Sequence, residues 1–233
     1  MNLNKYLVAF LLFLTKHSMA GEVFIDFPSE IRADEKYIIY SHGLIVEGSN
    51  NKPVHTRFGV YEFNLIKNAL VAGSDFNLIA EHRPKNTEIV IYARKLASWV
   101  KALVSAGVEP ANITLVGFSR GGELTAYASS ELNRLNINTV LLATCWPGSV
   151  QSKPEVTFGG NFLSVYETTD EALSCKDIAN KSKDLISFKE ISISTGKEHG
   201  AFFKPLEEWV TPVKQWINSK AVSILINDED KHR

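Results

Sequence analysis

A serine lies at the centre of the segment Gly117-Phe118-Ser119-Arg120-Gly121. The β-rich run Ile113–Gly117 leads directly into this segment, and residues of helical period follow it. A sharp turn from strand to helix needs residues without bulk two positions to either side of its apex, as Gly117 and Gly121 provide. Such a turn lifts the serine Oγ clear of a sheet. The context predicts a nucleophile at Ser119, with a helix cap as the alternative role.

A serine hydroxyl needs a base to take its proton before it can attack a carbonyl carbon. His199 lies in Gly196-Lys197-Glu198-His199-Gly200, between the last expected strand and the last expected helix. The glycines of this loop let the imidazole ring project over the strand ends. We therefore predict that His199 is the base, in preference to the other histidines after residue 20, which are His42, His55, His82 and His232.

The base needs a carboxylate that fixes its tautomer and stabilises the imidazolium that forms. Asp170 comes shortly after the expected strand Phe162–Glu167 and opens a helix that we expect to begin near Glu171. We predict that Asp170 is this carboxylate, although a helix N-cap is a frequent role for aspartate. If Asp170 is only a cap, Glu167 or Asp177 takes its place.

The negative oxygen of a tetrahedral intermediate needs two backbone donors. The expected strand Tyr37–Ser41 ends in His42-Gly43-Leu44, where Gly43 permits close approach of the backbone. We predict that the N–H groups of Leu44 and Arg120 form this oxyanion hole. The alternative is that Gly43 is a simple turn residue.

The elements that position these residues alternate along the chain. Short β-rich runs are followed by longer segments of helical period, which predicts an α/β fold with a mostly parallel sheet. One helix spans Glu88–Ala106, with Asn86 or Thr87 as its cap and Gly107 just past its end. The predicted strands are Val23–Phe27, Tyr37–Ser41, Phe76–Glu81, Ile113–Gly117, Thr139–Ala143, Phe162–Glu167 and Phe188–Ser192.

From roughly Lys36 to Ser219 the chain resembles the α/β-hydrolases. The turn around Ser119 matches the nucleophile elbow of that family, and the order Ser119, Asp170, His199 is the order that the family uses. The resemblance implies a three-layer α/β/α sandwich with an eight-stranded, largely parallel sheet, although only seven strands are predicted here. It also implies an acyl-enzyme mechanism without a metal or an organic cofactor.

One departure from the family concerns the substrate. Members that act on lipids commonly insert a helical lid after the strand that corresponds to Thr139–Ala143, where this chain has only Trp146–Gly160. We therefore expect an open site that takes a small-molecule ester or an acylated group on a larger carrier.

The first residues resemble an export signal. Lys5 precedes the apolar run Tyr6–Leu14, and Ser18-Met19-Ala20 places small residues before a cleavage site at Gly21. An uncleaved anchor is the alternative, but this run is shorter than the roughly 20 residues that cross a bilayer. We predict a signal peptide over 1–20, one domain over 21–233, and a secreted or periplasmic protein.

Composition limits the partners. The formal net charge of −1 offers no basic surface for nucleic acid, and no later segment is apolar enough to span a membrane. The only cysteines, Cys145 and Cys175, would meet an oxidising compartment, which favours a disulfide over two buried thiols. Two isolated cysteines do not have the spacing of a metal site.

Four basic side chains are candidates for the mouth of the site, namely Arg57, His82, Arg83 and Arg120. They would receive an anionic group of the substrate. Solvated loop charges or buried structural pairs are the alternative reading.

Together these patterns predict an exported serine hydrolase that cleaves ester bonds. An acyltransferase with the same triad is one alternative, and a non-catalytic binding protein on the same fold is another.

Overall fold

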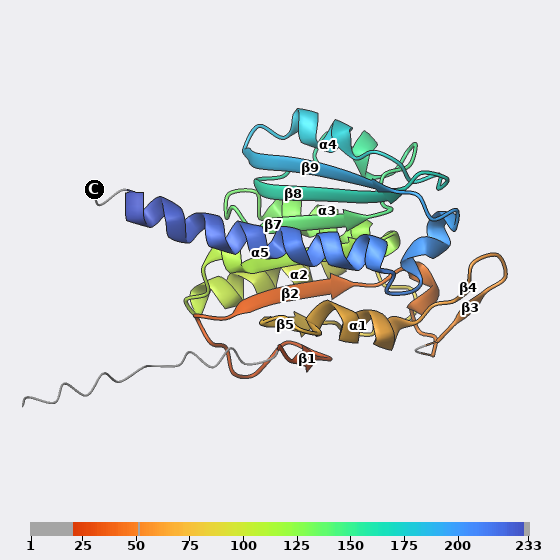
Figure 1. The fold of residues 1–233 in the computed structure, drawn as a ribbon, viewed down its shortest axis with the longest axis horizontal. Coiled ribbons are helices and arrows are strands. Elements are labelled where there is room, and N and C mark those ends of the chain that lie inside the picture. Colours follow the sequence, from red (N-terminus) through yellow and green to blue (C-terminus); the bar gives the residue numbers. More distant parts are fainter. Residues whose placement is uncertain (1–20, 51, 231–233) are drawn as a thin grey trace, which may run out of the picture.

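The computed structural model describes residues 21–50 and 52–230. The predicted signal peptide, residues 1–20, lies outside them. A seven-stranded sheet has the order β1-β5-β2-β6-β7-β8-β9, and every pair of neighbouring strands is parallel (Figure 1). Its strands are β1 (Val23–Phe24), β2 (Lys36–Ser41), β5 (Phe76–Ile79), β6 (Ile113–Phe118), β7 (Asn138–Leu142), β8 (Gly160–Glu167) and β9 (Leu185–Ile193).

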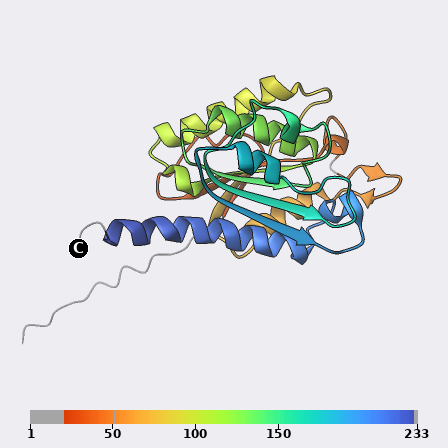
Figure 2. The ribbon, with the colours of Figure 1, turned by 90° about the horizontal axis from the view of Figure 1, so that it is seen from above.

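Helices cover both faces of the sheet. Helices α1 and α5 lie on one face, and α2 and α3 lie on the other (Figures 1 and 2). The predicted three-layer α/β/α sandwich is therefore confirmed. The helices are α1 (Phe63–Val71), α2 (Ile89–Ser105), α3 (Arg120–Glu131), α4 (Lys176–Lys181) and α5 (Glu207–Asp230), with 3-10 turns η1 (Leu44–Val46), η2 (Pro110–Asn112), η3 (Val150–Ser152) and η4 (Glu198–Phe202).

The central strands are apolar on both sides because each side faces a helical layer. Strand β6 is buried along its whole length. Its Val116 and Phe118 belong to the same cluster as Trp209 of α5, whereas Ile113 and Leu115 pack in the cluster of α2. The side chains alternate between the two layers with the period of a strand. This alternation determines the face of the sheet toward which each side chain at a strand end points.

All seven predicted strands are present in the sheet, one fewer than the resemblance implies. Apart from the 3-10 turns, one helix and one hairpin were not predicted. One is helix α1, and the other is the antiparallel hairpin of β3 (Val54–His55) and β4 (Gly59–Val60), which projects beyond the carboxyl ends of the strands (Figure 1).

Two helix starts differ from the predictions. Helix α2 has Glu88 at its N-cap with no side-chain cap, and the Thr87 hydroxyl donates instead to the Pro84 carbonyl. Gly107 follows the helix with a φ of +95°, as expected for a glycine that ends a helix. The helix predicted near Glu171 begins only at Lys176, as α4.

The structure joins Cys145 and Cys175 in a disulfide, with their Sγ atoms 2.12 Å apart. Cys145 follows β7, and Cys175 is the N-cap of α4. The Leu173 N–H also donates to the Cys145 carbonyl at 3.0 Å. The segment between Asp170 and α4 is thus fixed to the neighbouring loop at two points.

We expect the double variant Cys145→Ala/Cys175→Ala to have a free energy of unfolding about 3–4 kcal/mol lower than the oxidised protein, because the crosslink restricts the unfolded chain. Urea unfolding, with and without a reductant, measures this difference. Reduced wild type should behave like the variant. Equal unfolding midpoints for variant and oxidised wild type would contradict the prediction.

Candidate active site

Ser119 stands at the apex of the turn between β6 and α3. Its backbone has φ +54° and ψ −122°, a conformation that a non-glycine residue adopts only where its surroundings enforce it. The Ser119 N–H donates to the Leu142 carbonyl at 3.0 Å, and the Ser119 carbonyl accepts from Glu123 N–H at 3.1 Å. The turn is therefore held from the neighbouring strand and from the helix that follows.

Close packing explains the glycines of this turn. A Cβ atom added at Gly121 would lie 2.0 Å from the Ser41 carbonyl oxygen, and one at Gly117 would lie 2.4 Å from the Gly121 carbonyl oxygen. Gly122, which the sequence analysis did not single out, is equally restricted, because its Cβ would lie 1.8 Å from Thr144 Oγ1. The helix can approach the sheet this closely only without side chains there.

The structure brings the three predicted residues together at the carboxyl edge of the sheet. His199 Nε2 lies 2.9 Å from Ser119 Oγ, and His199 Nδ1 lies 2.7 Å from Asp170 Oδ2. With the proton assigned to Nδ1, the ring donates to Asp170 and accepts from the Ser119 hydroxyl. The Asp170 side chain is 6% exposed and that of His199 is 21% exposed, so the ion pair formed on protonation would be largely shielded from water.

Asp170 contacts His199 and is not a helix N-cap, because α4 begins only at Lys176 with Cys175 as its cap. Asp170 Oδ1 accepts the N–H groups of Glu171 at 2.7 Å and Ala172 at 3.3 Å, while its Oδ2 holds His199. The backbone therefore orients the carboxylate toward the ring. Of the alternatives, Asp177 lies in the first turn of α4, and Glu167 uses both oxygens on other groups.

The histidine is surrounded by aromatic rings. The Phe118 ring lies 4.8 Å from the His199 ring between centroids, and the Phe58 ring lies 6.1 Å away. Phe58 comes from the β3–β4 hairpin, and its neighbour Arg57 pairs with Glu198 at 2.5 Å. The hairpin thus packs against the loop that carries His199. No pattern around Phe58 had indicated this contact.

The predicted oxyanion donors belong to two segments near Ser119, the loop after β2 and the first residue of α3. A Cβ atom at Gly43 would lie 2.9 Å from Phe118 Cε1 and 3.9 Å from Ser119 Cβ, so this backbone passes close to Ser119. Within residues 21–50 and 52–230, the N–H groups of Leu44 and Arg120 donate to no protein acceptor. Both are available to a ligand.

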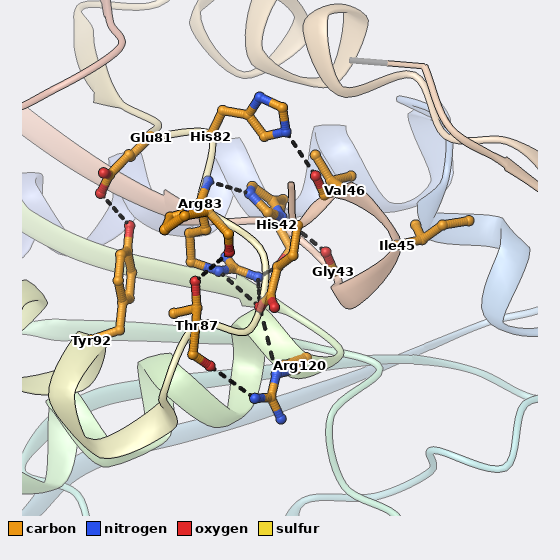
Figure 3. A network of polar contacts seen from close by, with 12 residues as sticks. His42, Gly43, Ile45, Val46, Glu81, His82, Arg83, Thr87, Tyr92 and Arg120 are labelled. Atoms are coloured by element: carbon orange, nitrogen blue, oxygen red, sulfur yellow. Dashed lines mark hydrogen bonds and ion pairs between the residues drawn. The ribbon is translucent and has the colours of Figure 1, made fainter. Parts of the chain in front are cut away.

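His42, whose role the sequence left undefined, holds the backbone at Gly43 through its ring (Figure 3). The ring is buried, donates from Nδ1 to the Gly43 carbonyl at 2.9 Å and accepts Arg83 N–H at 3.0 Å through Nε2. Burial, and then the positive charge of Arg83, hold the pKa of His42 well below its ordinary value. A neutral ring is the form that these two bonds require.

Of the two interpretations of the four basic side chains, the structure supports structural pairs for Arg83 and Arg120. Arg83 is fully buried, pairs with Glu47 at 3.2 Å and donates to the His42 carbonyl. Arg120 donates to the Thr87 carbonyl at 2.9 Å, as Figure 3 shows. These side chains bind the loops together, so they are structural pairs.

His82 belongs to the same structural network, because its Nε2 lies 2.7 Å from the Val46 carbonyl. Arg57 remains exposed at the rim, paired with Glu198. Among the described residues, no three His, Cys, Asp or Glu side chains are close enough together to hold a metal ion. In the same part of the chain, no helix is both long and apolar enough to cross a membrane.

The parallel sheet between two helical layers, with a strained serine turn at its carboxyl edge, is the α/β-hydrolase fold. Solved structures agree. An arylesterase superposes with a TM-score of 0.58 at 11% identity, over 82% of this chain and 77% of its own. A predicted CIB-like hydrolase from Thermoplasma acidophilum superposes with a TM-score of 0.56 at 13% identity, over 82% and 89%.

A variant of SOBER1 from Arabidopsis thaliana is also similar, with a TM-score of 0.53 at 14% identity, over 80% of this chain and all of its own. No protein-family model matches the sequence, and no curated protein does. At these low identities the structural similarity shows the fold alone. It is the fold that the resemblance of the chain to the α/β-hydrolases predicted.

Proposed function

We propose that this protein is a serine hydrolase that cleaves carboxylic esters or similar acyl bonds. The observation that carries the proposal is the continuous chain of contacts from Asp170 through His199 to Ser119, at 2.7 Å and 2.9 Å. These distances and this order of groups suit removal of the serine proton as the oxygen attacks.

The first half-reaction makes an acyl-enzyme. Ser119 Oγ attacks the carbonyl carbon while His199 Nε2 takes its proton, and Asp170 stabilises the imidazolium. The oxyanion accepts hydrogen bonds from the N–H groups of Leu44 and Arg120. When the tetrahedral intermediate collapses, the bond to the alcohol oxygen breaks, and His199 returns the proton to that oxygen.

The second half-reaction releases the acid. Water attacks the acyl carbon, gives one proton to His199 and forms a second tetrahedral intermediate. Collapse of that intermediate frees the carboxylic acid and returns the proton to Ser119 Oγ. Every step uses the same base and the same oxyanion donors, so no further group is needed.

The loop between β7 and β8 bears on the size of the substrate. Its one helical element among residues 143–159 is the 3-10 turn η3, three residues long. We infer a site without a helical lid, suited to small soluble esters or to acyl groups on a larger carrier. The likeness to an arylesterase supports an ester substrate.

Hydrolysis of short-chain aryl esters by the purified protein tests this proposal. We expect release of the aryl alcohol together with an equal amount of acid. An acyltransferase would instead give a new ester, with a yield that rises as an alcohol acceptor is added and at the expense of the acid. Product analysis with and without the acceptor separates the two activities.

We also propose export, with cleavage after Ala20. The Gly21 N–H donates to the Ser74 carbonyl at 3.0 Å, and a Cβ at Gly21 would lie 1.7 Å from the Phe76 carbonyl oxygen. Cleavage there would leave strand β1 intact.

We expect the exported protein to begin at Gly21 and the bulky variant Ala20→Trp to keep residues 1–20, because the cleavage site takes only small residues. Intact mass of each protein, isolated from medium or periplasm and from cells, measures this. A wild-type protein that stays inside the cells with residues 1–20 attached would contradict export.

A further inference from the structure

Glu167 is a buried carboxylate at the carboxyl end of β8, and both of its oxygens accept hydrogen bonds. Oε2 accepts the backbone N–H of Thr169 at 2.6 Å and the Thr169 hydroxyl at 2.5 Å. Oε1 accepts the N–H groups of Thr195 at 2.8 Å and Gly196 at 3.0 Å. A single side chain therefore satisfies four donors from two different loops.

These donors flank the acid and the base. Thr169 directly precedes Asp170, while Thr195 and Gly196 open the loop that carries His199. Burial raises the pKa of Glu167, but the hydrogen bonds from the two loops outweigh it and the pKa is lowered. The group is ionised at neutral pH, and hydrogen bonds to a charged acceptor are stronger than those to a neutral one.

The sheet itself does not fix these loops relative to one another. The ladder between β8 and β9 ends at the pair Glu167 and Ile193, and the Thr168 N–H makes one more bond, to the Ile193 carbonyl at 2.9 Å. One residue further on, the Thr168 hydroxyl donates to Ser194 Oγ at 3.3 Å, and the two chains then continue into the segment of Asp170 and the loop of His199. The Glu167 carboxylate bridges them where the ladder stops.

We propose that Glu167 is a positioning residue that sets the contact between Asp170 and His199 by clamping their two loops together. The proposal rests on the proposed function, since that contact matters for catalysis only if His199 is the base. Donors of Thr169, Thr195 and Gly196 take up both oxygens of Glu167, so it acts through the placement of Asp170 and His199.

The variant Glu167→Gln tests the clamp with little change of shape. A carboxamide has one acceptor oxygen, and its NH₂ group must face N–H or O–H donors whichever way it turns. At least one loop then loses its anchor. We expect kcat for ester hydrolysis to fall by about 10–100-fold, with KM within about twofold of wild type, because small misplacement of a catalytic group is costly.

Glu190→Gln is the matched control. Glu190 lies on β9, and its carboxylate accepts the Ser174 hydroxyl at 2.7 Å and the Cys175 N–H at 2.8 Å. The variant Glu190→Gln removes the same charge and also loosens the segment after Asp170. Glu190 itself does not contact the loop of His199. We expect kcat for Glu190→Gln to stay within about twofold of wild type.

A double-mutant cycle with Asp170→Asn distinguishes positioning from general damage. If Glu167 acts through the Asp170–His199 contact, Glu167→Gln should lower kcat by less than about twofold once Asp170 is already replaced. Independent effects would multiply instead, and that outcome would overturn the proposal. If Glu167→Gln does not fold, Thr169→Val removes one of the four bonds and should lower kcat by about 2–10-fold.

The low-field NMR signal of the His199 Nδ1 proton reports the same contact without turnover. We expect Glu167→Gln to shift or broaden this signal and Glu190→Gln to leave it in place. An unchanged signal and unchanged kcat in Glu167→Gln would overturn the clamp while the hydrolase stands. A wild-type protein without esterase activity would instead refute the proposed function, and the NMR comparison would still decide the geometry.

Discussion

Replacing Ser119 by alanine is expected to lower kcat for ester hydrolysis by roughly 10⁴–10⁶-fold, because no acyl-enzyme can then form. The backbone at this position, with φ +54°, is held by hydrogen bonds of the Ser119 N–H to Leu142 and of the Ser119 carbonyl to Glu123, and neither involves the hydroxyl. The variant should therefore fold as wild type does. Initial rates on an aryl ester, with thermal unfolding as a check, measure the effect.

Ser41→Ala is the control for this substitution. Ser41 ends β2 beside the elbow, and its buried Oγ has no hydrogen-bond partner among the described residues. Loss of this hydroxyl should leave kcat within about twofold. If Ser119→Ala kept more than about 1% of wild-type kcat, another residue would have to be the nucleophile.

The second large effect is expected for Asp170→Asn, a fall in kcat of about 10⁴-fold. Asp170 Oδ1 accepts the N–H groups of Glu171 and Ala172. The oxygen of an asparagine would therefore take the place of Oδ1 and accept the same two N–H groups. Its NH₂ group would then face His199 Nδ1 and donate to it. The ring would have to carry its own proton on Nε2, where it can no longer accept the proton of Ser119.

Asp177→Asn is the matched control, since Asp177 was the alternative acid and lies in the first turn of α4. We expect Asp177→Asn to change kcat by less than about twofold, as for a surface substitution away from the site. Steady-state rates of both variants decide the question. A strong loss in Asp177→Asn, with Asp170→Asn near wild type, would show that the acid had been assigned wrongly.

Much of the site could be predicted because each candidate residue follows a strand. Ser119, Asp170 and His199 come after β6, β8 and β9, and in a parallel sheet the carboxyl ends of these strands share one edge. The strands themselves are buried apolar runs that stand out in the sequence. Because the strands pair in parallel, the three side chains are expected at the same edge of the sheet.

Other features depend on contacts that no local pattern records. The β3–β4 hairpin has only two residue pairs, too few for a periodic signal, and its Phe58 meets His199 only in the folded chain. The sequence left Arg83 open between a cation at the mouth and a buried pair, because its partner Glu47 lies in a distant part of the sequence. Helix α1 did carry a signal, since Phe63, Ile66 and Leu70 are buried with helical spacing.

Glu167 is the clearest example of a role that the sequence alone does not predict. Its place at the end of a strand made it an alternative to Asp170 as the acid. Nothing in the sequence distinguishes Asp170, which contacts His199, from Glu167, which holds the two loops. Only the approach of Thr195 and Gly196 from the next strand gives Glu167 its four donors. That approach is a tertiary contact.

Reaction with a fluorophosphonate probe tests the central claim most directly, that Ser119 is a nucleophile activated by His199. The purified protein, Ser119→Ala and His199→Ala are treated alike, and the adduct is located by mass spectrometry. We predict one adduct, on Ser119 in wild type, and none in either variant. Folded wild type that does not react, or that reacts at another residue, would contradict the account and favour a binding protein on this fold.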